Sequence, residues 1–358
     1  MAASADDIVK RFERAQNALV LQASDLSLET IAAMVQSQSI DIAPLFQRRE
    51  RWDLFRQSSL IESFLLNIPV PPVYLSEDEF GRYSVIDGKQ RITAIHDYMR
   101  NRYALSSLER FSELEGLKFQ DLPEQLRNAL MVRPYIRAIT ILRQSDKATK
   151  FEVFHRLNSG GQPLNAQEVR NVIFRGPLND LIVHLSASPF LRKQLKIRDE
   201  KSSSYRDMTD VEFVLRYLTL REQWRTFSGD FRGSMDKFMS LHQKAGPKEI
   251  SEYLVSFERS LRICEEVWGD HAFKRPDKET WRDQALAGMY DAQMLAVDSL
   301  TNQESAAAVN KKDRVVKATR DLFADPEFEA SVRVATNTPA RVQLRVNEMT
   351  KALRASVK

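Results

Sequence analysis

The chain has few cysteines, glycines and prolines for its 358 residues. Its single cysteine, Cys264, excludes an intrachain disulfide bond and is typical of a reducing compartment. The 11 glycines and 13 prolines, with an apolar share of 43%, indicate an ordered globular protein. No apolar run is long enough to span a membrane, and residues 1–11 lack the apolar core of a signal peptide. We therefore expect a cytoplasmic protein with no membrane contact.

Motifs of several enzyme classes are missing as well. The five histidines are scattered, without H-E-x-x-H or Cys/His zinc spacing, so we predict no metal-ligating residues. The sequence has no G-x-S-x-G elbow, no P-loop and no G-x-G-x-x-G motif. Cys264 lies in a helix-like run without a nearby histidine, so a small buried hydrophobe is the simpler interpretation. Metalloproteases and hydrolases with a serine or cysteine nucleophile therefore have little support.

The net charge of +4 is too small to indicate a nucleic-acid binder without a concentrated basic face. Two segments, residues 192–206 and 341–358, are nevertheless locally basic. Solvated helix faces are the simpler explanation for both, and contact with a phosphate backbone is the alternative. The basic residues are Arg192, Lys193, Lys196, Arg198, Lys201 and Arg206 in the first segment, and Arg341, Arg345, Lys351, Arg354 and Lys358 in the second.

The hydrophobic pattern changes near Gly176. Helical and strand-like segments alternate before it, and helical periodicity continues almost to the end after it. We therefore predict an α+β protein, with a mixed domain over residues 1–176 and an all-helical domain over 177–358. The mixed domain should hold a helix over 6–22, helices after Ser27, Asp53, Gly88, Pro123, Asp146 and Asn165, and strands over 40–44, 73–75, 83–86 and 136–142. Residues 103–120 should be partly extended, and residues 302–312 and 336–339 should be loops or helix junctions.

Residues 83–95 are predicted to form a strand, a turn closed by Gly88 and an amphipathic helix. The backbone N–H groups and partial positive charge at a helix N-terminus favour an anion. Lys89 and Arg91 add positive side-chain charge at the same place. Taken alone, Asp87 is more simply explained as a helix cap than as a group that orients a metal ion or a water.

Gln47, Arg48 and Trp52 form a second polar cluster after the strand predicted over 40–44. The planar guanidinium of arginine binds phosphate oxygens in pairs, and a glutamine can donate beside it. Taken alone, this cluster is more simply explained as an exposed arginine patch with the tryptophan packed in the core.

A third cluster lies between two predicted helices. Gly160 and Gly161 give a flexible turn whose N–H groups can face an anion, and Asn165 stands where a helix cap belongs. The amide and guanidinium groups that follow exceed what capping requires. They belong to Gln167, Arg170 and Asn171, with Glu168 among them.

Taken together and in order, these clusters resemble the DUF262 family over about residues 28–175. DUF262 is the N-terminal part of GmrSD-type modification-dependent restriction enzymes, and it also occurs in phosphorothioate-sensing defence nucleases. Each motif is loose by itself, but all four in this order are specific. They are Gln47-Arg48 with Trp52; Ile68, Pro69, Pro71 and Pro72; Asp87, Gly88, Gln90, Arg91 and Thr93; and Phe154, Arg156, Leu157, Asn158, Gly160, Gly161, Leu164, Asn165, Gln167, Glu168, Arg170 and Asn171.

The resemblance implies a ParB/sulfiredoxin-like fold for the mixed domain, with nucleoside-triphosphate binding and hydrolysis that regulate DNA cleavage. It implies that Asp87, Gly88, Gln90 and Arg91 form the central phosphate site. Our hypothesis is that Asp87 and Arg91 are catalytic, Asp87 by positioning the attacking water or a Mg²⁺-bound water. Lys89 stands where the family most often has glutamine, and it keeps a donor while adding charge. The nucleotide would be bound by Gln47, Arg48, Gly88, Lys89, Gln90, Arg91, Thr93, Arg156, Asn158, Gly160, Gly161 and Asn165.

GmrSD-type proteins also carry an HNH-type nuclease domain, which needs a histidine-rich metal site. We find no such arrangement among His184, His242 and His271, so we expect no nuclease domain in this chain. Two hypotheses stay open. In the first, the protein is an NTP-hydrolysing regulator or sensor in a DNA restriction or phage-defence system. In the second, it is a non-catalytic module that binds nucleotide or DNA and acts with a separate nuclease subunit; an oligomer is compatible with either.

Overall fold

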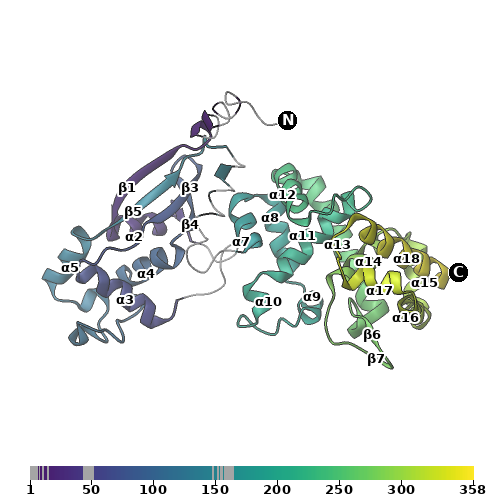
Figure 1. Ribbon diagram of the computed structural model, residues 1–358. Coiled ribbons are helices and arrows are strands. Elements are labelled where there is room, and N and C mark those ends of the chain that lie inside the picture. The colour runs from purple at the N-terminus through teal and green to yellow at the C-terminus, as the bar shows by residue number, and fades with distance from the viewer. Residues whose placement is uncertain are drawn as a thin grey trace. The chain divides into compact units, whose positions relative to one another are not determined.

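The computed structural model describes residues 7, 9, 12, 13, 16–42, 52–146, 149, 150, 153, 156 and 165–358. The chain divides into two compact units, Met1–Ile173 and Phe174–Lys358, which we call the sheet unit and the helical unit (Figure 1). The division falls just before Gly176, where the hydrophobic pattern of the sequence changes. The predicted α+β class is confirmed, because one unit is built on a sheet and the other is mostly helical.

A mixed five-stranded sheet with the order β1-β5-β3-β4-β2 organises the sheet unit. The antiparallel pairs are β1 (Leu21–Ser27) with β5 (Tyr135–Ile141), and β3 (Val73–Glu79) with β4 (Arg82–Asp87). The parallel pairs are β3 with β5, and the short β2 (Ile40–Asp41) with β4. Strand β4 therefore has a neighbour on each side, and its last residue, Asp87, lies opposite Tyr74 of β3.

The strands turn alternate side chains toward two apolar clusters, one on each face of the sheet. Val73 and Val85 belong to the larger cluster, whereas the adjacent residues Tyr74 and Ile86 belong to the smaller one. The smaller cluster also includes Val169 of α7 (Ala166–Ile173). The larger cluster is completed by α2 (Leu28–Gln36), α3 (Leu54–Leu65), α4 (Lys89–Met99) and α5 (Glu124–Val132). Helices α4 and α7 therefore pack against opposite faces of the sheet.

Helix starts follow the short polar signals in the sequence. The Ser27 hydroxyl accepts a hydrogen bond from the backbone N–H of Thr30 at 3.1 Å, and Asp53 accepts one from the N–H of Arg56 at 2.9 Å. Each cap satisfies an N–H group that the first helical turn leaves without a partner. These two predicted caps are confirmed.

Three predicted segments differ in part from the structure. The helix over 6–22 does not reach its expected end, because Leu21 begins β1 and pairs with Ile141 of β5. Residues 103–120 contain no strand, and they hold 3₁₀ turns instead. Residues 302–310 form α15 (Asn302–Asn310) and not a loop, because Thr301 and Glu304 make a reciprocal capping box at its start, and the helix junction within 302–312 lies at Lys311.

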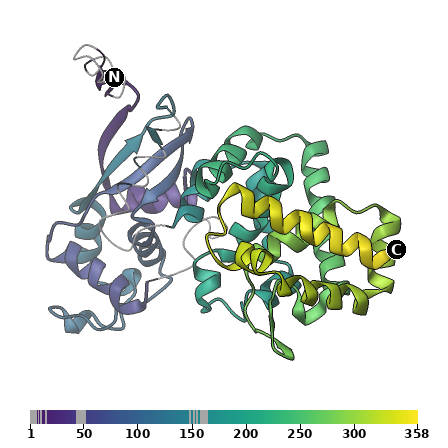
Figure 2. The same cartoon turned by 45° about the vertical axis from the view of Figure 1, so that its right-hand side comes forward.

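The helical unit is built from helices apart from a short hairpin of β6 (Pro276–Asp277) and β7 (Thr280–Trp281). Its central helix, α14 (Ala287–Asp298), is buried along nearly its whole length, and the C-terminal helix α18 (Pro339–Val357) packs against it (Figure 2). Cys264 is fully buried and burial raises the pKa of its thiol, which confirms a packing role. The other helices are α8 (Pro177–Ser186), α9 (Pro189–Gln194), α10 (Ser203–Arg206), α11 (Thr209–Gln223), α12 (Phe231–His242), α13 (Pro247–Trp268), α16 (Lys312–Asp321) and α17 (Pro326–Arg333).

Among the described residues, no helix combines the length and apolarity that a membrane crossing requires.

A buried charge network joins three helices of this unit. Asp291 of α14 accepts hydrogen bonds from Arg216 of α11 at 2.6 and 2.7 Å and from Arg345 of α18 at 2.5 Å. Arg345 and Asp291 have no exposed side-chain surface, so this arginine is not part of a solvated helix face, as its basic segment suggested. Arg345 also donates to the carbonyl groups of Ser331 and Thr336. The network therefore fixes α18 against α14.

Replacing Asp291 by asparagine should lower the free energy of unfolding by about 3–5 kcal/mol, because it leaves two buried cations without a counter-charge. Urea denaturation measures the change. The control is Glu348→Gln, which breaks an ion pair with the exposed Lys351 and should cost less than about 0.5 kcal/mol. Equal effects of the two substitutions would contradict this account of the network.

A second buried carboxylate, Glu62 of α3, holds the loop that follows α4. Its oxygens accept hydrogen bonds from the backbone N–H groups of Glu109, Arg110 and Phe111 at 3.1, 2.7 and 3.0 Å. Burial opposes ionisation of Glu62, but these N–H groups outweigh it and hold the pKa of the carboxyl below its ordinary value of 4.5.

The ionised form of Glu62 should therefore stabilise the fold above pH 4.5, and the stabilisation should be lost as the pH falls through the lowered pKa. At neutral pH, Glu62→Gln should reduce the free energy of unfolding by about 1–3 kcal/mol. The difference from the unsubstituted protein should shrink in acid, where Glu62 is itself protonated. Denaturant curves across pH measure this, with Glu109→Gln on the same loop as the exposed control; a difference independent of pH would contradict it.

Candidate functional site

The predicted strand, turn and helix at residues 83–95 form around one glycine. Gly88 follows β4 and precedes α4 with a φ of +91°, a left-handed conformation that residues with a side chain rarely adopt. A Cβ atom at this position would lie 2.5 Å from Cγ1 of Val73 on β3. Glycine is therefore needed twice, for the direction of the chain and for its close approach to the neighbouring strand.

This turn brings Asp87 and Arg91 together. Nη2 of Arg91 donates to Oδ2 of Asp87 at 2.8 Å and to the carbonyl oxygen of Pro72 at 3.1 Å. The arginine side chain is 16% exposed and the aspartate side chain 41% exposed. The guanidinium is thus held in one place between the turn and the start of β3. One oxygen of Asp87 is committed to positioning Arg91.

Gln90 connects the turn to the chain that follows the Gln47-Arg48 cluster. Its Oε1 atom accepts a hydrogen bond from the backbone N–H of Trp52 at 3.0 Å, and Gln57 of α3 donates to the Trp52 carbonyl at 2.9 Å. Trp52 packs against the larger apolar cluster, as the sequence predicts. Gln47 and Arg48 themselves lie outside the described residues.

Helix α7 lies beside the strand that delivers Asp87, because Val169 packs with Ile86. Oδ1 of Asn165 accepts from the N–H groups of Gln167 and Glu168 at 2.9 Å, and Glu168 accepts from the N–H of Asn165 at 2.7 Å. This reciprocal capping confirms Asn165 as the helix cap. Its side-chain oxygen is therefore occupied by the helix itself.

The polar side chains of α7 are buried, which is unusual for a short helix. Arg170 and Gln167 are each 1% exposed, and Asn171 is fully buried. Gln167 donates to Asn171 at 3.0 Å, and Arg170 approaches Gln167 at 3.4 Å. Buried groups of this kind form a network that fixes one arrangement of the helix.

The structure places the predicted site residues unevenly. Gly88, Lys89, Gln90, Arg91 and Thr93 share the turn and the first helical turns of α4. Arg156 is exposed, whereas Asn158, Gly160 and Gly161 lie outside the described residues. The contact of Arg91 with the Pro72 carbonyl was not predicted. The one signal for it was that Pro72 belongs to the Ile-Pro-x-Pro-Pro element that precedes β3.

The donors at this turn suit a phosphate group better than a metal ion. Nε of Arg91 is buried without a hydrogen-bond partner in the part of the chain that the structure describes. Gly88 lets the backbone at the N-terminus of α4 come close to a bound group, and this end of the helix carries partial positive charge. Within the same described residues, no three His, Cys, Asp or Glu side chains gather as metal ligands.

Three of the six basic residues of segment 192–206 in the helical unit form ion pairs. Lys193 pairs with Asp270 at 2.6 Å and Lys196 with Asp283 at 3.0 Å. Arg192 pairs with the buried Asp210 at 3.3 Å. The segment therefore offers less positive charge to a phosphate backbone than its sequence suggests.

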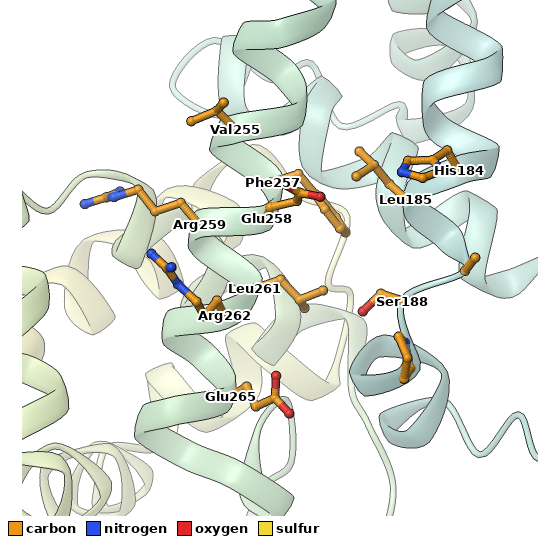
Figure 3. Close-up of a pocket in the computed structure, with 12 residues that line it drawn as sticks. His184, Leu185, Ser188, Val255, Phe257, Glu258, Arg259, Leu261, Arg262 and Glu265 are labelled. Atoms are coloured by element: carbon orange, nitrogen blue, oxygen red, sulfur yellow. The ribbon is translucent and has the colours of Figure 1, made fainter.

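A groove of about 640 Å³ lies between α8 and α13 of the helical unit (Figure 3). Leu185 and Ser188 line one side, and Leu261 and Glu265 of α13 line the other. Arg259 is turned away from Ser188 and donates to the Leu300 carbonyl at 2.7 Å. The groove mixes apolar and oppositely charged side chains, and we assign no chemistry to it.

The fold and the turn define the sheet unit as a mixed α+β domain with a glycine-dependent, cationic strand–turn–helix. Residues 31–175 match the family model described as GmrSD restriction endonuclease, N-terminal domain. The predicted resemblance to the DUF262 type is therefore confirmed as a domain match over these residues. No curated protein and no solved structure matches the chain. The ParB/sulfiredoxin-like fold therefore stays a prediction.

Substituting alanine for Gly88 should destabilise the sheet unit more than the same change at Gly116. Both glycines have positive φ, but a Cβ at Gly116 meets no atom within 4 Å. Gly116→Ala should cost about 1–2 kcal/mol for the left-handed backbone alone. Gly88→Ala should cost at least about 1 kcal/mol more because of the contact with Val73. Denaturation measures both free energies of unfolding. In a Val73→Ala background, the additional destabilisation by Gly88→Ala should be smaller. Equal destabilisation by Gly88→Ala and Gly116→Ala would show that the contact with Val73 does not matter.

Proposed function

We propose that the sheet unit binds the phosphates of a nucleoside triphosphate at the Asp87–Arg91 turn and hydrolyses the nucleotide to regulate DNA restriction. The observation that carries the proposal is the fixed guanidinium of Arg91, held by Asp87 and by the Pro72 carbonyl at the N-terminus of α4. A pre-positioned donor stabilises the charge of a transferring phosphoryl group without having to reorganise. The family's name supplies the connection to restriction.

Each residue of the turn has a separate task in this proposal. Lys89 and the N-terminus of α4 offset the negative charge of the phosphates. Arg91 binds phosphoryl oxygens through the nitrogens that Asp87 and Pro72 leave unused. Asp87 is first a positioning residue for Arg91, and its other carboxylate oxygen orients a water molecule. Mg²⁺, when bound with the nucleotide, supplies further charge neutralisation.

The remaining site residues complete the pocket in the same proposal. Gln90 places the segment after Gln47 and Arg48 beside the turn through its bond to Trp52. Arg156, Asn158, Gly160 and Gly161 are proposed to close the pocket from the side of α7. We further propose that the protein works in the cytoplasm with a separate nuclease subunit.

Arg91→Ala and Asp87→Asn should each reduce nucleotide turnover by about 100-fold or more. The first substitution removes the fixed guanidinium, and the second removes the carboxylate that holds the guanidinium in place. Phosphate release from ATP, GTP, CTP and UTP with Mg²⁺ measures the effect. Arg133→Ala, at an exposed residue just after α5, is the control and should leave turnover unchanged. Unchanged turnover in both site variants would rule out this assignment.

A sensor that binds nucleotide without hydrolysing it is the second candidate, and one observation favours it. Asp87 already bonds Arg91, so the turn holds its carboxylate in a structural role. In this case a triphosphate should raise the melting temperature with increasing concentration while no phosphate is released. Phosphate release that depends on Asp87 would favour the hydrolysing enzyme over the sensor.

A further inference from the structure

A second hollow in the helical unit, of about 400 Å³, lies where the C-terminal ends of α11 and α14 meet the side of α18. Its volume falls within the range of small-molecule sites, roughly 300–1,000 Å³. Three of its lining side chains are arginines and one is an aspartate. The lining residues are Arg221, Trp224, Arg225, Leu295, Asp298, Ser299, Val346, Asn347, Thr350 and Arg354.

Hydrogen bonds hold the helices that line this hollow in fixed positions relative to one another. Asn347, Thr350 and Arg354 follow one another at helical spacing, so they lie on one face of α18. Gln343 of α18 donates to the Arg225 carbonyl at 2.8 Å, which fixes α18 to the end of α11. Arg354 donates to the Ser299 carbonyl at 3.1 Å, which fixes it to the end of α14. The arginines therefore face a preformed space.

Two of these arginines have unused donors. Arg221 forms an ion pair with Asp298, with Nε 3.3 Å from Oδ2, but this buried Nε makes no hydrogen bond among the described residues. The guanidinium of Arg225 lies over the Trp224 ring, 4.3 Å from its centre, in a cation–π contact. No carboxylate in the described part of the chain pairs with Arg225. Other arginines of this unit, such as Arg216 and Arg345, donate to carboxylate or carbonyl oxygens.

Helix ends offer another reason for arginines at this place. The C-termini of α11 and α14 carry partial negative charge, about half an elementary charge each, which cations offset. However, their terminal carbonyl groups already accept hydrogen bonds from other donors. Leu220 accepts from the N–H of Trp224, Gln223 from the N–H of Thr226, Ala296 from the hydroxyl of Ser299, and Ser299 from Arg354. Capping therefore uses Arg354, and Asp298 offsets part of the charge of Arg221, which leaves Arg225 to be explained.

We infer that this hollow is an anion site for a phosphate group, separate from the turn at Asp87. Guanidinium groups match phosphate oxygens with paired hydrogen bonds, and Arg221 of α11 and Arg225 just after its end line the same hollow. The amide of Asn347 and the hydroxyl of Thr350 complete the set of polar contacts. The inference concerns the helical unit alone and does not depend on the function proposed for the sheet unit.

Calorimetric titration of the full chain with pyrophosphate tests this site. Arg225→Ala should weaken binding at least tenfold, and so should Asn347→Asp, which places a carboxylate beside the anion. Both positions are exposed, so the fold does not rely on them. Arg314→Ala, at an exposed arginine of α16, is the matched control and should bind as the unsubstituted protein does.

The Arg91→Ala variant separates binding at this hollow from binding at the turn in the sheet unit, because it should leave this pyrophosphate site intact. Binding lost in Arg91→Ala but unchanged in Arg225→Ala and Asn347→Asp would overturn the inference and support the site at Asp87. Binding lost only in the two helical-unit variants would support the inference whatever becomes of the proposed function. Succinate binding as tightly as pyrophosphate would overturn the assignment to phosphate. Parallel titrations with AMP and a short oligodeoxynucleotide identify the phosphate ester that the site accepts.

Discussion

The conformation of Gly88 is the constraint on which the site in the sheet unit depends. Its left-handed backbone turns the chain from β4 into α4 directly against Val73. This turn sets Asp87 and Arg91 at bonding distance and brings Arg91 within reach of the Pro72 carbonyl. The ion pair is partly exposed and contributes about 1 kcal/mol or less, whereas an unsuitable backbone residue costs about 1–3 kcal/mol. The backbone, more than the ion pair, therefore determines the geometry.

Several parts of the fold could be predicted because their causes are local. Ser27, Asp53 and Asn165 cap helices through bonds to N–H groups two or three residues away, so a short stretch of sequence contains the whole signal. Strand β1 has no such signal. Its residues alternate poorly, and its conformation comes from pairing with the distant β5, where Asp25 also binds Arg137 at 2.9 Å. Helical periodicity in this segment was overridden by long-range pairing.

The candidate site shows the same division between local and distant causes. The cationic turn after Asp87 could be predicted from adjacent residues. The contact of Gln90 with Trp52 and the burial of Arg170 could not, because both depend on elements far apart in the chain. Arg345 is the clearest case: its sequence neighbours suggested a solvated face, but its counter-charge lies on α14. The family match ends at residue 175, so the chemistry of the helical unit has to be argued from its own side chains.

The network around Asp291 has an evolutionary consequence. One carboxylate serves two arginines, so the buried group carries a surplus positive charge. Losing either arginine would leave a balanced pair, whereas losing the aspartate first would leave two cations facing each other in the core. Substitutions at these three positions should therefore accumulate in a preferred order, with an arginine replaced before the aspartate. Descendants of this chain that have lost Asp291 should have passed through a sequence with a single arginine.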